Sequence, residues 1–372
     1  MPSVTKTWLE WVRTLYPGYF AAVMATGIVS IALFLTGAPA LSSALLVVGC
    51  AVLALLTLIY VLRLARFREA VRADALDPSK TFGYFTFVAA LGVLATRFAL
   101  GGASVTPAIF TIVAVVAWLT LTYWTFSMLL FSNEQPIERS VNGSWLIAIV
   151  ATESLAITWV LLARIAPEWR GPLQFLSYVF WSFGVLLYLI FITFIMYRFF
   201  FQRLHPNDLT PPYWINMGAM AITTVAGVRL LQTPAPSAFL ASLEPYIEGF
   251  TVMMWAWGTW WIPLLLIIGV WKYLVSREPI RYHPALWSVV FPLGMYATAV
   301  HLLSHLAGLA FLRPFGAPLT WIAFTAWALV ALGWAWSCVA AVRRARPEQA
   351  RSSHQLAARP SATSDEAGAP VP

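Results

Sequence analysis

Residues 17–30 read PGYFAAVMATGIVS, and segments of the same character open four later apolar stretches of the chain. These are FGYFTFVAALGVLA (82–95), NGSWLIAIVATESLA (142–156), PYWINMGAMAITTVAG (212–227) and ALWSVVFPLGMYATA (285–299). Each begins with a small or turn-forming residue and an aromatic residue, and then becomes rich in Gly, Ala, Ser and Thr. With Phe20, Phe85, Trp145, Trp214 and Trp287 as matching positions, the spacings are 65, 60, 69 and 73 residues. Such regular spacing indicates a repeated helical hairpin.

The composition places all five repeats in a membrane. Of 372 residues, 60% are hydrophobic and only 10% are charged, whereas soluble domains carry about 25% charged residues. Long apolar runs separated by Gly and Pro predict ten membrane-spanning helices. They cover residues 18–36, 41–65, 82–100, 106–131, 142–163, 172–200, 212–231, 245–275, 284–305 and 316–342. We expect an all-α transmembrane domain over 17–342, a short segment over 1–16, and a disordered tail over 343–372.

The basic residues are distributed unevenly between the two sides of these ten runs. Five of the 23 Lys and Arg residues follow odd-numbered runs: Arg97, Arg164, Arg170, Arg229 and Arg313. The other 18 lie at the termini or follow even-numbered runs. The positive-inside rule therefore predicts a multi-pass protein of the inner or plasma membrane with both termini in the cytoplasm. The net positive charge is therefore explained by basic residues at the cytoplasmic surface of the membrane. We do not expect a nucleic-acid partner.

The repeats predict five hairpins in a quasi-five-fold ring around a central pore. Helices rich in small residues approach one another closely, so the odd-numbered helices are expected inside and the bulkier even-numbered helices toward lipid. The alternative is that small residues only mark tight packing around a filled core.

Position four after each matching aromatic suggests a gate. The residues there are Met24, Ala89, Ile149, Gly218 and Phe291. Only Phe291 brings an aromatic ring to this level, and one ring can block a narrow pore. Pro292 follows and is expected to bend the helix so that the ring points inward. The alternative is that Phe291 packs against lipid or a neighbouring helix.

Position eight after each aromatic lies on nearly the same helix face. The residues there are Ile28, Val93, Glu153, Ile222 and Met295. Glu153 is therefore predicted to line the pore, where a carboxyl group at membrane depth indicates a functional site. The alternative is a structural carboxyl group that hydrogen-bonds hydroxyls such as that of Thr152.

Other polar residues carry weaker signals. Arg97 and Arg229 end odd-numbered helices and either attract anions to the outer mouth or extend to lipid phosphate. His301 and His305 share a helix face, but two ligands without a third do not predict a metal site. Phosphate-binding, dinucleotide and metalloprotease motifs are not found in the sequence. We therefore expect neither enzymatic activity nor a cofactor.

Several segments resemble the tellurite-resistance/C4-dicarboxylate transporter family, which includes fungal malate and sulfite transporters and plant slow anion channels. They are PGYFAAVMATGIVSIAL, NGSWLIAIVAT, TPPYWINMGAMAITTVAG, WAWGTWWIPLLLIIGVW and WSVVFPLGMYATAV. The resemblance spans residues 16–340 and implies five hairpins around a pore, often in a homotrimer. It also implies that a phenylalanine of the ninth helix occludes the pore, and Phe291 matches it. Glu153 departs from the family, where this position more often resembles a glutamine.

The resemblance implies transport of small anions across a lipid bilayer. C4-dicarboxylates such as malate are the leading candidates, with tellurite or sulfite as variants. The alternative is a proton-coupled transporter of other small solutes that uses Glu153.

Overall fold

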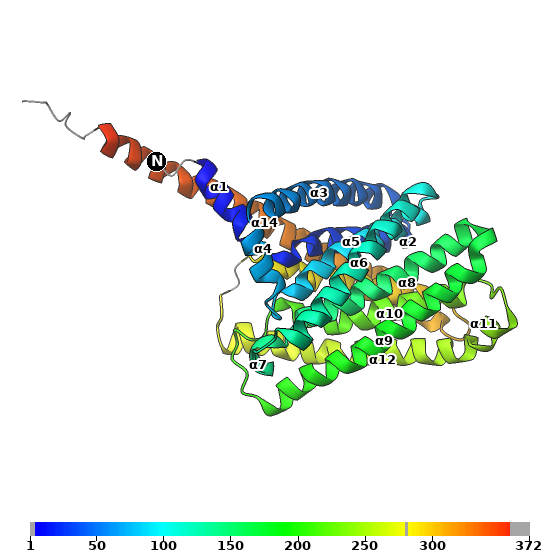
Figure 1. The fold of residues 1–372 in the computed structure, drawn as a ribbon. Coiled ribbons are helices and arrows are strands. Elements are labelled where there is room, and N and C mark those ends of the chain that lie inside the picture. The colour runs from blue at the N-terminus through cyan, green and yellow to red at the C-terminus, as the bar shows by residue number, and fades with distance from the viewer. Residues whose placement is uncertain (1–3, 280–281, 358–372) are drawn as a thin grey trace, which may run out of the picture.

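The computed structural model describes residues 4–279 and 282–357, and its long helices lie side by side in one bundle (Figure 1). Within these residues, ten helical segments are long and apolar enough to cross a membrane. They are Pro17–Leu35, Pro39–Arg66, Thr81–Leu100, Val105–Phe131, Gly143–Ile165, Pro167–Phe201, Pro211–Leu231, Glu244–Val275, Pro284–Leu303 and Ala310–Ala340. Each overlaps one predicted run, so the prediction of an all-α fold with ten spans is confirmed.

Five of these segments, the central helices, begin with a 3₁₀ turn that leads into an α-helix. The turns are η1 (Pro17–Phe20), η2 (Thr81–Tyr84), η3 (Gly143–Leu146), η5 (Pro211–Trp214) and η7 (Pro284–Leu286). The α-helices are α2 (Ala21–Leu35), α5 (Phe85–Leu100), α8 (Ile147–Ile165), α10 (Ile215–Leu231) and α13 (Trp287–Leu303). Three of the turns start with proline, which suits a first helical turn because its missing N–H has no partner there.

The other five segments, the peripheral helices, cover the outside of the bundle. They are α3 (Pro39–Arg66), α6 (Val105–Phe131), α9 (Arg170–Phe201), α12 (Glu244–Val270) and α14 (Arg313–Ala357). In the most apolar stretch of each central segment 72–89% of residues are buried, against 6–44% in the peripheral segments. Apolar surface on this scale is stable only against lipid or another protein. The peripheral helices therefore form the lipid-facing layer.

The central helices close into a ring. Each packs against the next along the chain, α13 packs against α2, and each also packs against the peripheral helix that follows it. Glycines permit the close approach: a methyl group on Gly218 of α10 would lie 2.8 Å from Cγ of Pro292 on α13. A methyl group on Gly294 of α13 would lie 2.9 Å from Cγ2 of Ile28 on α2. This arrangement fits the five predicted hairpins.

Short elements lie before, between or at the ends of the spans. They are α1 (Val4–Arg13), α4 (Arg68–Ala75), α7 (Ile137–Ser140), η4 (Pro167–Trp169), α11 (Ala238–Ser242), the π-helical turn η6 (Trp271–Val275) and η8 (Ala310–Leu312). Buried cations at the ends of peripheral helices anchor two of the connections. Arg63 of α3 pairs with Asp74 of α4, and Arg198 of α9 lies 3.3 Å from Asp208.

The C-terminal segment differs from its predicted disorder. Helix α14 continues to Ala357, beyond the boundary at residue 343. Residues 343–357 include four Arg, three Ala and two Gln, which are strong helix formers. Residues 358–372 lie outside the described residues.

Candidate functional site

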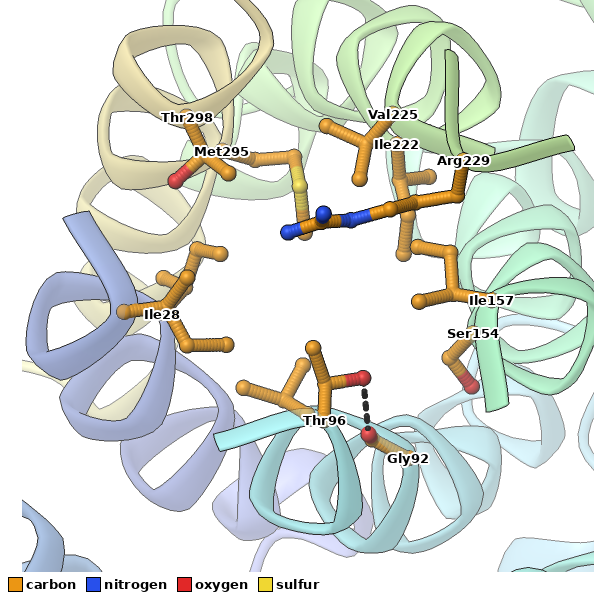
Figure 2. A pocket seen from close by; sticks show the side chains of 12 residues that line it. Ile28, Gly92, Thr96, Ser154, Ile157, Ile222, Val225, Arg229, Met295 and Thr298 are labelled. Atoms are coloured by element: carbon orange, nitrogen blue, oxygen red, sulfur yellow. Dashed lines mark hydrogen bonds between the residues drawn. The ribbon is translucent and has the colours of Figure 1, made fainter. Parts of the chain in front are cut away.

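A narrow cavity lies inside the ring of central helices, toward their C-terminal ends. All five central helices contribute to it: Ile28, Ile31, Gly92, Val93, Thr96, Ser154, Ile157, Ile222, Val225, Arg229, Met295 and Thr298 line the space. Figure 2 shows these side chains pointing toward a common centre. The cavity has a volume of about 20 Å³, which is room for one or two water molecules.

The lining residues correct the alignment of the third repeat. In four repeats the cavity is lined at positions eight and eleven after the matching aromatic, as with Ile222 and Val225 after Trp214. In α8 the cavity is lined by Ser154 and Ile157. These are positions eight and eleven after Leu146, not after Trp145. A shift of one residue rotates a side chain by about 100° around the helix axis. Every position predicted for this repeat is therefore turned to another face.

Trp145 misled the alignment because its indole serves a local contact. Its Nε1 donates to the carbonyl oxygens of Ser140 at 2.8 Å and Pro78 at 3.2 Å. The ring packs in a stacked arrangement against Phe82, with centroids 4.8 Å apart. Trp145 therefore packs against the preceding loop and does not mark the register of the third repeat.

Glu153 consequently points away from the cavity. Its side chain is fully buried and lies against Gly184 of the peripheral helix α9. Its Oε1 accepts a hydrogen bond from Thr223 Oγ1 of α10 at 3.1 Å, and Oε2 has no hydrogen-bond partner among the described residues. The prediction that Glu153 lines the pore is corrected by the register of α8: the neighbouring Ser154 lines the cavity instead.

Thr152 and Ile149 belong to the same correction. Thr152 Oγ1 accepts a hydrogen bond from Trp118 Nε1 of the peripheral helix α6 at 2.8 Å and donates to the Ala148 carbonyl at 2.8 Å. Thr152 is therefore directed toward the lipid-facing layer. Ile149 is fully buried, and the shifted register brings Val150, rather than Ile149, to the level of Phe291.

Along η7 and α13, Phe291 falls between residues that line a second, wider cavity and residues that line the narrow one. Along the same chain segment, Ala285 and Leu286 line the wider cavity and Met295 lines the narrow one. Phe291 stands one helical turn before Met295 and is only 1% exposed. Met24, Ala89 and Gly218, predicted at its level, are also buried. None of these four residues lines the narrow cavity.

Pro292 packs where α10 and α13 come closest. Its ring faces Gly218, which has no side chain to hold the two helices apart. Helix α13 continues through Pro292 from Trp287 to Leu303. Proline here removes one backbone hydrogen bond. Gly218 thus accommodates a proline on the neighbouring helix rather than lining the cavity.

The wider cavity, here called the vestibule, lies at the N-terminal ends of the central helices and has a volume of about 620 Å³. The turns at the repeat starts and their connections line it, with Tyr16, Ser79, Glu138, Arg139, Asn142, Ser144, Arg198, Asn207, Asp208, Thr210, Pro211, Pro212, Lys272, Tyr273, Glu278, Pro279, His283, Ala285 and Leu286. Charges of both signs occur here. Sequence reasoning missed this space because no contiguous motif encodes it.

Polar partners engage several vestibule side chains. Arg198 Nη1 donates to the Val141 carbonyl at 2.6 Å, and Lys272 Nζ donates to the Leu209 carbonyl at 2.8 Å. His283 Nδ1 accepts a hydrogen bond from the backbone N–H of Ala285 at 3.1 Å. Burial lowers the pKa of His283, which favours the neutral ring that this hydrogen bond requires.

The two arginines predicted at the outer mouth occupy different environments. Arg97 Nε donates to Ser42 Oγ at 3.0 Å and Ser30 Oγ at 3.2 Å, and its guanidinium lies 4.4 Å from the centre of the Phe34 ring. Arg97 does not line the narrow cavity. Arg229 does, and Figure 2 shows its side chain extending across the opening.

His301 and His305 lie beyond the cavity at the C-terminal end of α13. Their ring centroids are 5.2 Å apart. In the described part of the chain, no group of three or more His, Cys, Asp or Glu side chains is arranged to hold a metal ion. Among the described residues, His301 and His305 therefore lack a third metal ligand.

Comparison with known proteins matches this sequence to a family. Residues 14–335 match the family model described as "Voltage-dependent anion channel". An uncharacterized transporter of Methanocaldococcus jannaschii is 26% identical over 337 residues, covering 88% of this chain and 95% of that protein. A second from the same organism is 23% identical over 330 residues, covering 86% and 93%.

A shorter relative is more similar in sequence. An uncharacterized membrane protein of Mycobacterium tuberculosis is 39% identical over 162 residues, covering 43% of this chain and 79% of that protein. The family match covers most of the chain and all five central helices, in agreement with the resemblance seen in the sequence. This multi-pass membrane protein belongs to the voltage-dependent anion channel family.

Proposed function

We propose that the protein transports small anions across a membrane through the ring of central helices, with Phe291 occluding the path. The observation that supports the proposal is that Phe291 is buried and falls, along η7 and α13, between residues that line the vestibule and residues that line the narrow cavity. The family match supports the anionic substrate. The narrow cavity also contains a cation and no carboxylate among its lining residues.

The walls of the narrow cavity favour the passage of an ion over its retention. They are apolar apart from Arg229 and a few hydroxyl groups, so an ion meets one charged contact rather than a full coordination shell and can leave again. C4-dicarboxylates such as malate remain the leading substrates, with tellurite and sulfite as variants. The charge asymmetry of the loops supports an orientation with the vestibule and both termini in the cytoplasm of a cell. A homotrimer is the expected assembly.

The test is anion flux into proteoliposomes, with chloride, malate, sulfite and tellurite supplied separately. We expect Phe291→Ala to raise flux several-fold over the wild type, because the proposed gate is the ring that this substitution removes. Phe191→Ala is the matched control, since Phe191 of α9 is equally buried but packs against Phe82 and Trp145. Equal flux in wild type and Phe291→Ala would contradict the gate.

Proton-coupled transport is the second candidate, favoured by the buried Glu153 and its unpartnered Oε2. A carboxyl group without a charged partner in a dry site is suited to hold a proton. In the same proteoliposomes, flux that follows an imposed proton gradient and is lost in Glu153→Gln would favour this mechanism. Anion flux that is unchanged in Glu153→Gln would favour the uncoupled pathway.

A further inference from the structure

We propose that Arg229 forms a binding subsite for one small anionic group inside the narrow cavity. The ligand is a halide-sized ion or the single carboxylate or oxyanion head of a larger anion. This inference rests on the proposed function for the sign of the ligand's charge. It adds the residue that binds the anion and a limit on the size of the bound group.

The first support is the environment of the guanidinium. Arg229 is 7% exposed and stands in the last turn of α10, where Nη1 donates to Gln232 Oε1 at 3.2 Å. Its Nε is buried and has no hydrogen-bond partner among the described residues. Gln232 therefore holds one edge of the group while the Nε donor stays unused.

The second support is the absence of a counter-charge. None of the ion pairs found in the described part of the chain includes Arg229. A buried cation without a carboxylate carries a large free-energy penalty, and such residues in membrane proteins mark ion pathways. A bound anion would supply both the missing charge and the missing acceptor.

The third support is the shortage of other donors in the cavity. The hydroxyl groups of Thr96, Thr298 and Ser154 donate to the carbonyl groups of Gly92, Gly294 and Ala151 on their own helices. Figure 2 shows the bond from Thr96. These hydroxyls have thus donated their one proton within their own helices. Among the lining side chains, the guanidinium is the donor left for a ligand.

The size of the cavity sets the class of ligand. A volume of about 20 Å³ holds one or two small atoms or groups. The surrounding Ile28, Ile222 and Met295 side chains cannot replace lost hydration. A chloride ion or one carboxylate head fits this space beside Arg229. The rest of a dicarboxylate would extend out of it.

Arg97 provides a matched control within the same molecule. It is also buried and also ends a central helix, but its Nε is occupied by Ser30 and Ser42. It lies outside the cavity. Removing its charge changes the electrostatics of the same end of the bundle without changing the subsite.

The experiment measures chloride binding directly, through the extra NMR linewidth that purified protein in detergent imposes on chloride. It is run at about pH 8, where ordinary histidines are neutral. We expect a saturable component in the wild type and in Arg97→Gln, and its loss in Arg229→Gln. Arg229→Lys keeps the charge and should retain the component with several-fold weaker affinity. Gel filtration checks that each variant is folded.

Competition separates the two sources of the anionic group. Acetate that displaces chloride supports a subsite for a carboxylate head, and malate should then compete as well. Displacement by nitrate alone supports a subsite for small free ions. A saturable component unchanged in Arg229→Gln would overturn the inference. Because no transport is measured, that result leaves the proposed function intact, and absent flux with intact binding would affect only the proposed function.

Discussion

The vestibule and the narrow cavity arise from the same five repeats but differ in size and charge. The vestibule, about 620 Å³, is lined by turns and connections that carry cations and carboxylates together. The narrow cavity, about 20 Å³, is lined by the helices two or more turns further on and contains one cation. The turns at the repeat starts also pack closely, since a methyl group on Gly143 would lie 2.5 Å from the backbone nitrogen of Tyr213. The vestibule is bounded mainly by the connections next to these turns.

The difference indicates where selection takes place. Charges in a wide, hydrated space are screened by water and salt, so each acts weakly on a passing ion. In the narrow cavity an ion loses most of its water, and a single charge acts strongly. Discrimination is therefore expected in the narrow cavity, and the vestibule is expected to serve as an access space.

The largest effect is expected from filling the narrow cavity. Val225→Phe adds a ring to a space that holds one or two waters, so anion flux in the Phe291→Ala background should fall by about tenfold or more. Asn207→Phe adds the same ring to the wall of the vestibule, where Asn207 is exposed, and should leave flux nearly unchanged. Equal loss in both variants, measured in proteoliposomes, would mean that the two cavities limit flux alike.

An intermediate effect on stability is expected behind the narrow cavity, at the contact of Glu153 with Gly184. A methyl group on Gly184 would overlap the carboxyl group, and overpacking of this kind typically costs about 1–3 kcal/mol. We expect Gly184→Ala to lower the melting temperature in detergent by several degrees.

The double variant Gly184→Ala/Glu153→Ala is the control for this contact. It removes the group that the new methyl would strike, and should recover most of the loss caused by Gly184→Ala. If the loss persisted, the carboxyl group would have to be elsewhere, for example turned toward the cavity as the sequence alignment predicted.

The smallest effect is expected at the vestibule wall. Arg139 is exposed there and takes part in none of the ion pairs found among the described residues. Because its charge is screened, Arg139→Gln should change the anion concentration for half-maximal flux by less than about twofold. A change as large as that caused by Arg229→Gln would remove the distinction between the two cavities.

The sequence predicted some site residues and missed others for identifiable reasons. The sequence predicts both Arg97 and Arg229 at the outer mouth. It does not show that only Arg229 faces the cavity, because Arg97 is held by hydroxyl groups of other helices. Matching Trp145 to the other aromatics puts Glu153 on the pore face, whereas Leu146 holds the matching position in the structure. An error of one residue has little effect on the bounds of a helix and changes completely which face a side chain occupies.

The sequence by itself determined the class of protein, the ten spans and the division into small-residue and bulky helices. These follow from apolar length and composition, which are local properties of the chain. The tertiary structure alone decided which side chains meet inside the ring: Ser154 rather than Glu153, and Arg229 rather than Arg97. Those choices depend on the rotation of each helix about its axis, which is set by packing against neighbours distant in the sequence.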